Sequence, residues 1–291
     1  DWKEIAKSPT ENYMLMEDLD FMNEGDSVRI TTVLEGKLDG NDHKIKNIHV
    51  TGYLFANIKN EFKDLIIENC ELKSASGMGV IINHNGKLKN VHVKNIQLTK
   101  TTITQTGTIG GLTAVSRGPV ENCSIQGILI KDETFSYNSR IGGFIGVANG
   151  ATVNNCYVQN LNLKANNAYY YGGVGGLIGA IEVKSTVDSC YVTGEIQTTG
   201  GNIGGLVGPM ATGEIRNSYS TVNITGSPNG FAGIVGRAGS GGIMVVDHNL
   251  SLGNLYTSLK DQIGERIVAG REEIGENYAF EEQKINGRIT E

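Results

Sequence analysis

The stretch NIGGLVGPMATGEIRNSYSTVNITG, at residues 202–226, decides the fold because most of the chain consists of imperfect copies of it. Repeats spaced by roughly thirty residues are typical of solenoids, in which each repeat forms one coil and packs on its neighbours. The sequence therefore predicts a stack of coils. Copies of the opening motif IGGLVG start at Ile109, Ile141, Val174, Ile203 and Phe231.

An asparagine is the second anchor of the repeat, and it aligns Asn69, Asn90, Asn122, Asn155 and Asn217. Positions at fixed distances from this asparagine in each copy define two columns of side chains. We expect the two columns on opposite faces because strand side chains alternate. The column expected to face the interior is Leu72, Val93, Ile125, Val158, Val192, Ser220 and Leu250. The column expected to face outward is Glu71, His92, Ser124, Tyr157, Tyr191, Tyr219 and Asn249.

Side chains that alternate between two faces, in copies that stack in parallel, predict an all-β fold. We expect a single-stranded parallel β-helix, right-handed, of about eight coils with short capping segments. Asparagine tolerates the left-handed conformation of a bend and can hydrogen-bond along a stack. The glycine pair allows either a positive φ or a close approach of two backbones. A helical solenoid would lose about 1 kcal/mol for each such glycine.

The positions at which the repeat begins and ends predict three segments of the chain. Residues 1–30 are expected to form an N-terminal cap and the first strand, because DWKEIAK has a short helical pattern that Pro9 ends. Residues 31–256 are expected to form the coils, and residues 257–291 a C-terminal cap or a junction to another domain. The loops before each glycine pair vary in length, and such loops are where solenoids usually bind.

Composition and motifs exclude several functions. The net charge of −6, without a basic cluster, argues against nucleic acid and an anionic membrane as partners. No apolar run reaches the eighteen or so residues that span a bilayer, and the chain starts at Asp1 without a signal peptide, as expected of a mature or excised fragment. The metallopeptidase motif H-E-x-x-H is absent. We expect neither catalytic nor metal-binding residues here.

The cysteines and carboxylates have structural interpretations. We expect free, buried thiols stacked at one point of the repeat, at Cys70, Cys123, Cys156 and Cys190. Glu121 and Asp188 would lie two coils apart, near 10 Å, just beyond the separation in an inverting glycosidase. Lys89 and Arg216 could neutralise them from adjacent coils, which favours a solvated charge ladder.

Tyrosines are the candidate binding residues. Tyrosine offers a large rigid surface with a polar tip, which suits binding, but it also stacks across strands for structural reasons. Both explanations stay open for the column Tyr157, Tyr191 and Tyr219 and for the loop aromatics Phe135, Tyr137, Tyr169, Tyr170 and Tyr171.

The repeat (I/V)GG(L/F)-x-G, followed by N-C/S-Y-x-x-G, resembles the GLUG repeat of bacterial surface proteins over residues 108–242. The flanking segments W-x-x-I, NYMLMEDLDF, HNLSLGNLY, RIVAG and ENYAF extend the resemblance to the non-catalytic region of streptococcal immunoglobulin A peptidases and of zinc metalloproteinases B and C. The resemblance implies a secreted or wall-attached extracellular zinc endopeptidase of a Gram-positive bacterium. The zinc and the catalytic domain would lie outside this chain.

From this resemblance we expect the β-helix to position or recognise a host glycoprotein such as immunoglobulin A for the catalytic domain of the same polypeptide. Two alternatives remain open. An adhesin or stalk needs only the repeats, and a carbohydrate-active β-helix enzyme would need Glu121 as a catalytic residue, which we do not expect.

Overall fold

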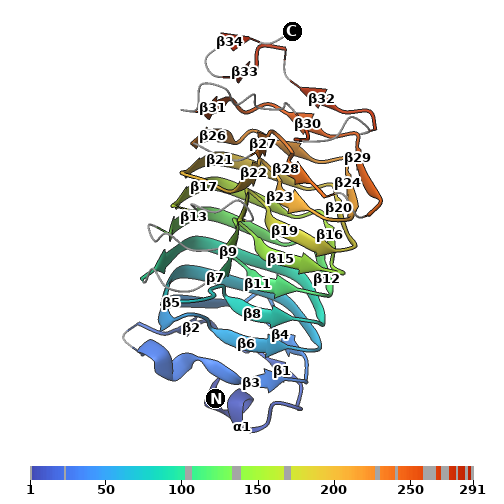
Figure 1. Cartoon of the computed structure of the whole chain (residues 1–291). Helices are drawn as coiled ribbons and strands as arrows, with labels where there is room; N and C mark the ends of the chain where they lie inside the picture. Colours follow the sequence, from blue (N-terminus) through green and yellow to red (C-terminus); the bar gives the residue numbers. More distant parts are fainter. Residues whose placement is uncertain are drawn as a thin grey trace.

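In the computed structural model the chain winds into a parallel β-solenoid of about eight turns. The structure describes residues 2–22, 24–101, 107–132, 139–166, 172–226, 230–239, 242–257, 267–269, 275–279, 281–285 and 288–289. Figure 1 shows the described coils stacked along one axis, with the two termini at opposite ends. The predicted all-β, parallel fold is confirmed. Its right-handed sense and the segment boundaries at residues 30 and 256 stay predictions.

Three sheets run along the solenoid in the described residues, and each coil contributes to all three in the central repeats. The eight-stranded sheet contains β3 (Ile30–Leu34), β6 (Phe55–Ile58), β8 (Ile81–His84), β11 (Thr113–Ser116), β15 (Ile145–Asn149), β19 (Ile178–Val183), β23 (Val207–Met210) and β28 (Val235–Ala238). The five-stranded sheet contains β10 (Thr108–Gly110), β14 (Arg140–Gly142), β18 (Gly173–Gly175), β22 (Asn202–Gly204) and β27 (Gly230–Ala232).

The largest sheet bends around the remaining sides of the coils. Its N-terminal strands are β1 (Tyr13–Met14), β2 (Leu19–Asp20), β4 (Leu38–Asp39), β5 (Lys44–Thr51), β7 (Glu61–Ser74) and β9 (Lys87–Lys100). Its central strands are β12 (Pro119–Glu121), β13 (Ser124–Asp132), β16 (Thr152–Asn154), β17 (Tyr157–Ala165), β20 (Ser185–Asp188) and β21 (Tyr191–Thr198). Its C-terminal strands are β24 (Gly213–Arg216), β25 (Tyr219–Ser220), β26 (Asn223–Gly226), β29 (Met244–Asp247), β30 (Leu250–Ser251), β31 (Leu255–Thr257), β32 (Tyr278–Ala279), β33 (Lys284–Ile285) and β34 (Arg288–Ile289).

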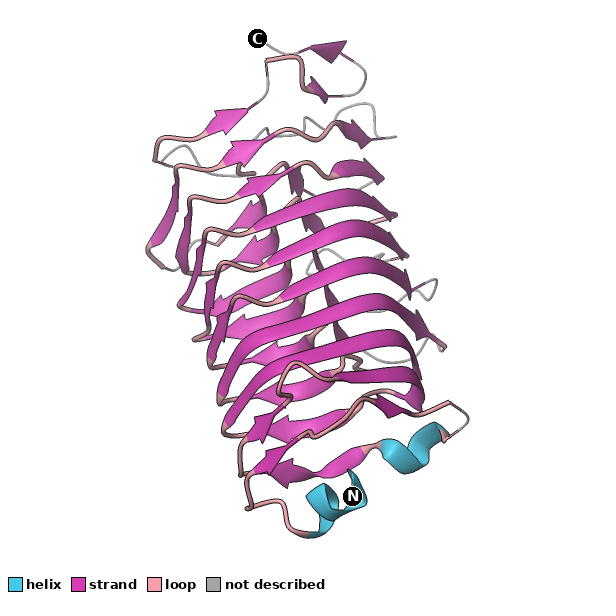
Figure 2. Ribbon diagram, turned by 180° about the vertical axis from the view of Figure 1, so that it is seen from behind, coloured by secondary structure: helices cyan, strands magenta, loops and turns pink. Residues whose placement is uncertain are grey.

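Two short helices cover the N-terminal coil, where Figure 2 shows them. They are α1 (Trp2–Lys7) and the 3₁₀-helix η1 (Gly25–Val28). The Trp2 ring packs 5.1 Å from the Phe21 ring, and its Nε1 donates a hydrogen bond of 2.7 Å to the carbonyl of Val28. Helix α1 thereby shields the apolar end of the stack from water, as a cap must.

The glycine pairs allow two backbones to touch. None of the glycines in these pairs has a positive φ among the described residues. A Cβ on Gly142 would instead lie 1.9 Å from the carbonyl oxygen of Ile145, and one on Gly175 would lie 1.9 Å from that of Ile178. The five-stranded and eight-stranded sheets therefore meet at a tight re-entrant corner, which only glycine permits.

Asparagine forms two ladders of bends, where the sequence predicted one. The first ladder contains Asn90, Asn122, Asn155 and Asn217, each with φ between 50° and 54°. Asn155 donates its amide to Asn122 at 2.8 Å. The alignment of Asn69 with this set is wrong, because Asn69 donates to Asn47 at 3.2 Å and accepts from Asn95 at 3.3 Å in the second ladder.

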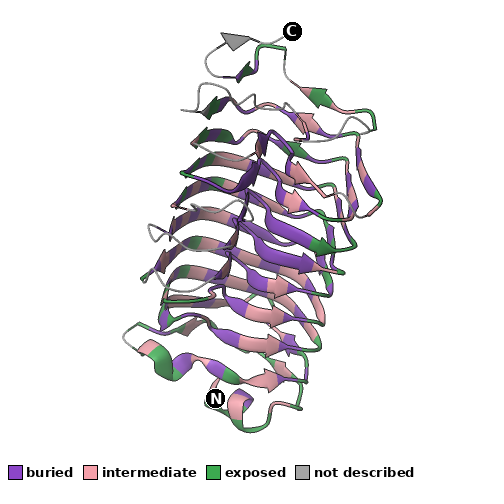
Figure 3. Cartoon of the chain, in the orientation of Figure 1, coloured by how far each residue is buried: buried purple, intermediate pink, exposed green. Residues whose placement is uncertain are grey.

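The predicted columns are displaced at both ends. Ile67, not Leu72, pairs with Val93 in the interior column, and Ile66, not Glu71, pairs with His92 in the outward column. At the C-terminal end His248 takes the left-handed position with φ 54°, so Leu250 pairs with Tyr219 and faces outward, while Asn249 is buried. The other pairings match the prediction. Figure 3 shows buried positions alternating along the strands.

The four cysteines are free and buried, as predicted. Cys70 is the exception to the predicted stack, because it pairs with Ile96 in a different bend. Cys123 and Cys156 do stack, with the amide N–H of Cys123 lying 3.4 Å from Cys156 Sγ. Burial raises the pKa of Cys156 and raises that of Cys70 to about 12. These thiols fill the core and are not poised as nucleophiles.

Candidate binding surfaces

Three tyrosines of the predicted outward column form a stacked ladder. The rings of Tyr157 and Tyr191 have centroids 4.8 Å apart and planes 6° apart, and the corresponding values for Tyr191 and Tyr219 are 4.9 Å and 1°. The pairing continues through Leu250 to Tyr278, which is 60% exposed. The structure thus brings these three predicted site residues together along β17, β21 and β25.

The ladder presents ring edges and hydroxyl groups to solvent, since each ring covers a face of the next. Gln126 Nε2 lies 3.3 Å from the Tyr157 hydroxyl oxygen, and Gln159 Nε2 lies 2.7 Å from that of Tyr191. Burial is the larger cause that raises the pKa of Tyr191, and the neighbouring tyrosines raise it further. The ladder therefore stiffens this face, and a ligand would meet it as a polar ridge.

The predicted loop aromatics Phe135, Tyr137, Tyr169, Tyr170 and Tyr171 lie outside the described residues. Their position relative to the ladder therefore stays a prediction. The ladder itself lies across the core from the glycine corner. Val192, which points inward next to Tyr191, has its Cγ1 2.9 Å from where a Cβ on Gly176 would be.

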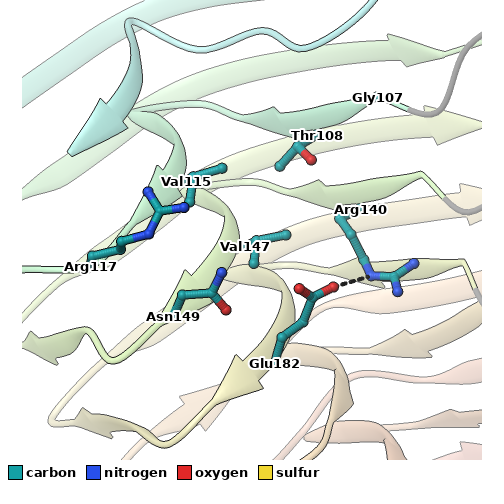
Figure 4. A pocket seen from close by; sticks show the side chains of 8 residues that line it. All are labelled: Gly107, Thr108, Val115, Arg117, Arg140, Val147, Asn149 and Glu182. Carbon is teal, nitrogen blue, oxygen red and sulfur yellow. Dashed lines mark hydrogen bonds and ion pairs between the residues drawn. The ribbon is translucent and has the colours of Figure 1, made fainter. Parts of the chain in front are cut away.

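The re-entrant corner between the five-stranded and eight-stranded sheets holds a hollow of about 330 Å³. Arg140 enters it from β14, and Glu182 enters from β19; Arg140 Nε lies 3.3 Å from Glu182 Oε1. Figure 4 shows these two side chains pointing toward each other, with Arg117 and Asn149 on the other side of the hollow. A second hollow of about 310 Å³ adjoins it and shares Arg140 and Glu182.

Glu182 reaches this corner because of a β-bulge. Ala148 pairs with Ile181 and Asn149 pairs with Val183, so Glu182 is the extra residue in β19. Bulges re-aim a side chain and are common beside functional sites. Glu182 is not among the residues predicted from the sequence, although a signal existed: the run from Val174 to Cys190 is one residue longer than the run from Ile141 to Cys156.

Two serine–histidine pairs have the geometry of a nucleophile and its base but are inaccessible. His84 Nδ1 lies 3.0 Å from Ser116 Oγ, and His92 Nδ1 lies 2.8 Å from Ser124 Oγ. Ser116 is 0% and Ser124 2% exposed. Burial also lowers the pKa of both histidines, that of His84 to about 4. A substrate could not reach these hydroxyls, so the pairs join adjacent coils.

The predicted charge ladder exists with different partners. Glu121 pairs with Lys87 at 2.7 Å, whereas Lys89 was expected. Arg216 pairs with Asp247 at 2.9 Å, whereas Asp188 was expected. Asp188 accepts hydrogen bonds from Asn217 and Ser189 at 2.9 and 3.0 Å. Each carboxylate thus has its own structural partner, as in a solvated ladder.

Two kinds of feature are absent from the described part of the chain. There, no three histidine, cysteine, aspartate or glutamate side chains are grouped so that they could hold a metal ion. The same part contains no helix with the length and apolar character needed to cross a membrane.

Comparisons with known proteins bear on the fold and the repeat. The family model of the GLUG motif matches residues 199–225. No curated protein sequence matches the chain. A solved structure described as "IgA1 Protease" is 22% identical with a TM-score of 0.57, over 89% of this chain and 21% of that chain. A "putative immunoglobulin A1 protease" from Bacteroides ovatus is 18% identical with a TM-score of 0.59, over 96% of this chain and 81% of that chain.

The chain therefore spans only 21% of the length of the first of these proteins. At identities of 22% and 18%, the likeness to these two structures shows a shared fold. The family match adds the GLUG motif at residues 199–225. We conclude that the chain is a β-solenoid that carries the GLUG motif at residues 199–225 and has the fold found in proteins described as immunoglobulin A1 proteases.

Proposed function

We propose that this chain is the non-catalytic β-solenoid unit of an immunoglobulin-A-protease-like protein and that it binds the protein substrate. The catalytic region, which we propose to be a zinc metalloendopeptidase, would lie elsewhere in the same polypeptide. The whole protein would act outside the cell, secreted or attached to the wall of a Gram-positive bacterium. The substrate would be a host glycoprotein such as immunoglobulin A.

The observation that carries the proposal is the position of the corner hollow relative to the variable segments. Thr108, Arg140 and Gly173 open strands that directly follow the segments of variable sequence. Thr108 and Arg140 also line the hollow. A concave site with a few convergent polar groups, beside variable loops on a rigid scaffold, is the arrangement expected of a binding surface.

Binding and cleavage test the proposal in two steps. The chain of residues 1–291 should bind immunoglobulin A in biolayer interferometry, and the whole protein should lose substrate cleavage when this unit is deleted. Changing Tyr169, Tyr170 and Tyr171 together to alanine should weaken both. Tyr256→Ala, at an exposed tyrosine of β31 that is not a candidate binding residue, is the matched control. Unchanged cleavage after deletion of the unit would refute the binding role.

A spacer is the second candidate function, and the tyrosine ladder favours it. Rings stacked at 4.8 and 4.9 Å with nearly parallel planes stiffen the coil stack on one face. If replacing the unit by an unrelated solenoid of equal length preserved cleavage, the spacer would be favoured over substrate binding.

A further inference from the structure

The two hollows at the glycine corner form one groove along the solenoid. They adjoin at Arg140 and Glu182, and their lining extends from Thr108 to Arg237. These residues belong to five successive coils, so the groove is about 19 Å long at roughly 4.8 Å per coil. About six residues of an extended peptide have that length.

The first hollow offers an unused donor and an unused acceptor. Arg117 is exposed, and its guanidinium makes no ion pair with any residue that the structure describes. Asn149 Oδ1 is buried and accepts no hydrogen bond from the described protein. A buried acceptor without a partner costs about 1–3 kcal/mol. Asn149 lines the hollow, so a ligand N–H reaches this oxygen when the side-chain amide turns toward the hollow, and binding then removes that cost.

The groove is basic on an acidic molecule. Its described lining contains the guanidinium groups of Arg117, Arg140 and Arg237 but a single carboxylate, that of Glu182. The whole chain has a net charge of −6. Guanidinium groups bind carboxylates by charge-assisted hydrogen bonds. An anionic ligand is thus favoured here over a cationic one.

The floor and walls favour a peptide over a sugar. Val115 and Val147 contribute apolar surface, and the described lining residues include no aromatic ring on which a sugar could stack. An extended peptide carries the N–H groups that Asn149 can accept and the side-chain carboxylates that Arg117 can bind. Added strand pairing is excluded, since β15 and β19 are already paired on both sides.

We propose that this groove binds an extended acidic segment of a protein, with a carboxylate at Arg117 and an N–H donated to Asn149. The inference rests on the proposed function, because it names the part of a protein substrate that this surface holds. Glu182 has a defined role in it: its ion pair with Arg140 opposes acidic ligands and limits their affinity.

The test is a titration of the 291-residue chain with a capped peptide of about eight residues that alternates glutamate and serine. Arg117→Gln should weaken binding about tenfold or more, as expected for loss of a charge-assisted contact. Glu182→Gln should strengthen it about threefold, because a repulsive charge is removed. Lys164→Gln removes one charge from an exposed site on β17 and should change binding less than about twofold.

Three outcomes would overturn the inference. Equal binding of the peptide with glutamine in place of glutamate would remove the role of the carboxylate. Binding of a glucuronic acid oligomer but not of the peptide would assign the groove to a sugar acid. If immunoglobulin A still binds the chain while groove variants have no effect, the groove inference fails and the proposed function stands. If the peptide binds but immunoglobulin A does not, the proposed function fails and the groove inference stands.

Discussion

Arg140 on β14 and Glu182 on β19 meet across the corner of two sheets, with Arg140 Nε 3.3 Å from Glu182 Oε1. The two side chains are 21% and 48% exposed, so solvent screens their attraction. We therefore expect Glu182→Gln to lower the free energy of unfolding by less than about 1 kcal/mol. Urea denaturation measures this. A loss several times larger would mean that the pair is structural and unsuited to a binding site.

Gly142→Ala should destabilise the chain strongly. The new Cβ would lie 1.9 Å from the carbonyl oxygen of Ile145, which is backbone and cannot move aside. We expect a loss of more than about 3 kcal/mol or failure to fold, measured by thermal melting. Gly150→Ala is the matched control, since Gly150 has φ +84° and nothing within 4 Å of the added Cβ. It should cost only about 1–2 kcal/mol.

His84 should make stability depend on pH between about 6.5 and 4. Burial lowers its pKa from 6.5 to about 4, so the unfolded chain binds a proton in this window and the folded chain does not. Stability is then greatest above 6.5 and falls by at most about 3 kcal/mol as pH drops to 4. Urea midpoints of the parent and of His84→Gln, measured across this range, should converge at low pH. Parallel curves would contradict the prediction.

Lys100 and Asp132 form a buried ion pair between adjacent coils, at 3.5 Å and with exposures of 0% and 2%. Lys100→Met removes the cation that faces the buried carboxylate of Asp132, so we expect a loss of about 3–5 kcal/mol. The double variant Lys100→Met, Asp132→Leu removes both charges and should recover most of that loss. Urea denaturation of the three proteins forms the test. Equal losses in the single and double variants would show that the ion pair itself is stabilising.

Tyr191 lies between two rings, so its replacement separates stacking from hydrogen bonding. Tyr191→Phe keeps both ring contacts and loses the contact of its hydroxyl with Gln159 Nε2, which we expect to cost about 0.5–1.5 kcal/mol. Tyr191→Leu also loses two ring pairs, worth about 0.5–1.5 kcal/mol each. Denaturation ranks the two variants. A loss of immunoglobulin A binding at unchanged stability would instead make the ladder a binding surface.

The period of the repeat and the alternation of its side chains were enough to predict the parallel β-solenoid. Register was harder to predict because two bends of each coil favour the same residue type. Asn90 and Asn95 both have left-handed backbones, at φ 54° and 55°, and lie five residues apart in one strand. Asn69 could therefore be assigned to the wrong ladder. At the C-terminal end His248 occupies the left-handed position, which displaced the alignment by one residue.

The groove could not be predicted from the repeat because it depends on a departure from it. The interior and outward columns follow from local alternation, whereas Glu182 is aimed by an added residue and meets an arginine from another sheet. Arg117 and Asn149 belong to neither of the two columns that the sequence alignment of the repeats defines. Only the corner that Gly142 and Gly175 permit brings their side chains into one hollow with Arg140.

Because the coils pair in parallel, the length of the solenoid grows by the same step with each added coil. Each coil bonds only to its two neighbours, and each adds about 4.8 Å along the axis. Duplicating one coil on the C-terminal side of β28 would move everything beyond it by that step and leave the groove unchanged. Evolution can therefore adjust the reach of the protein in increments of one repeat, without redesigning the surface that contacts a partner.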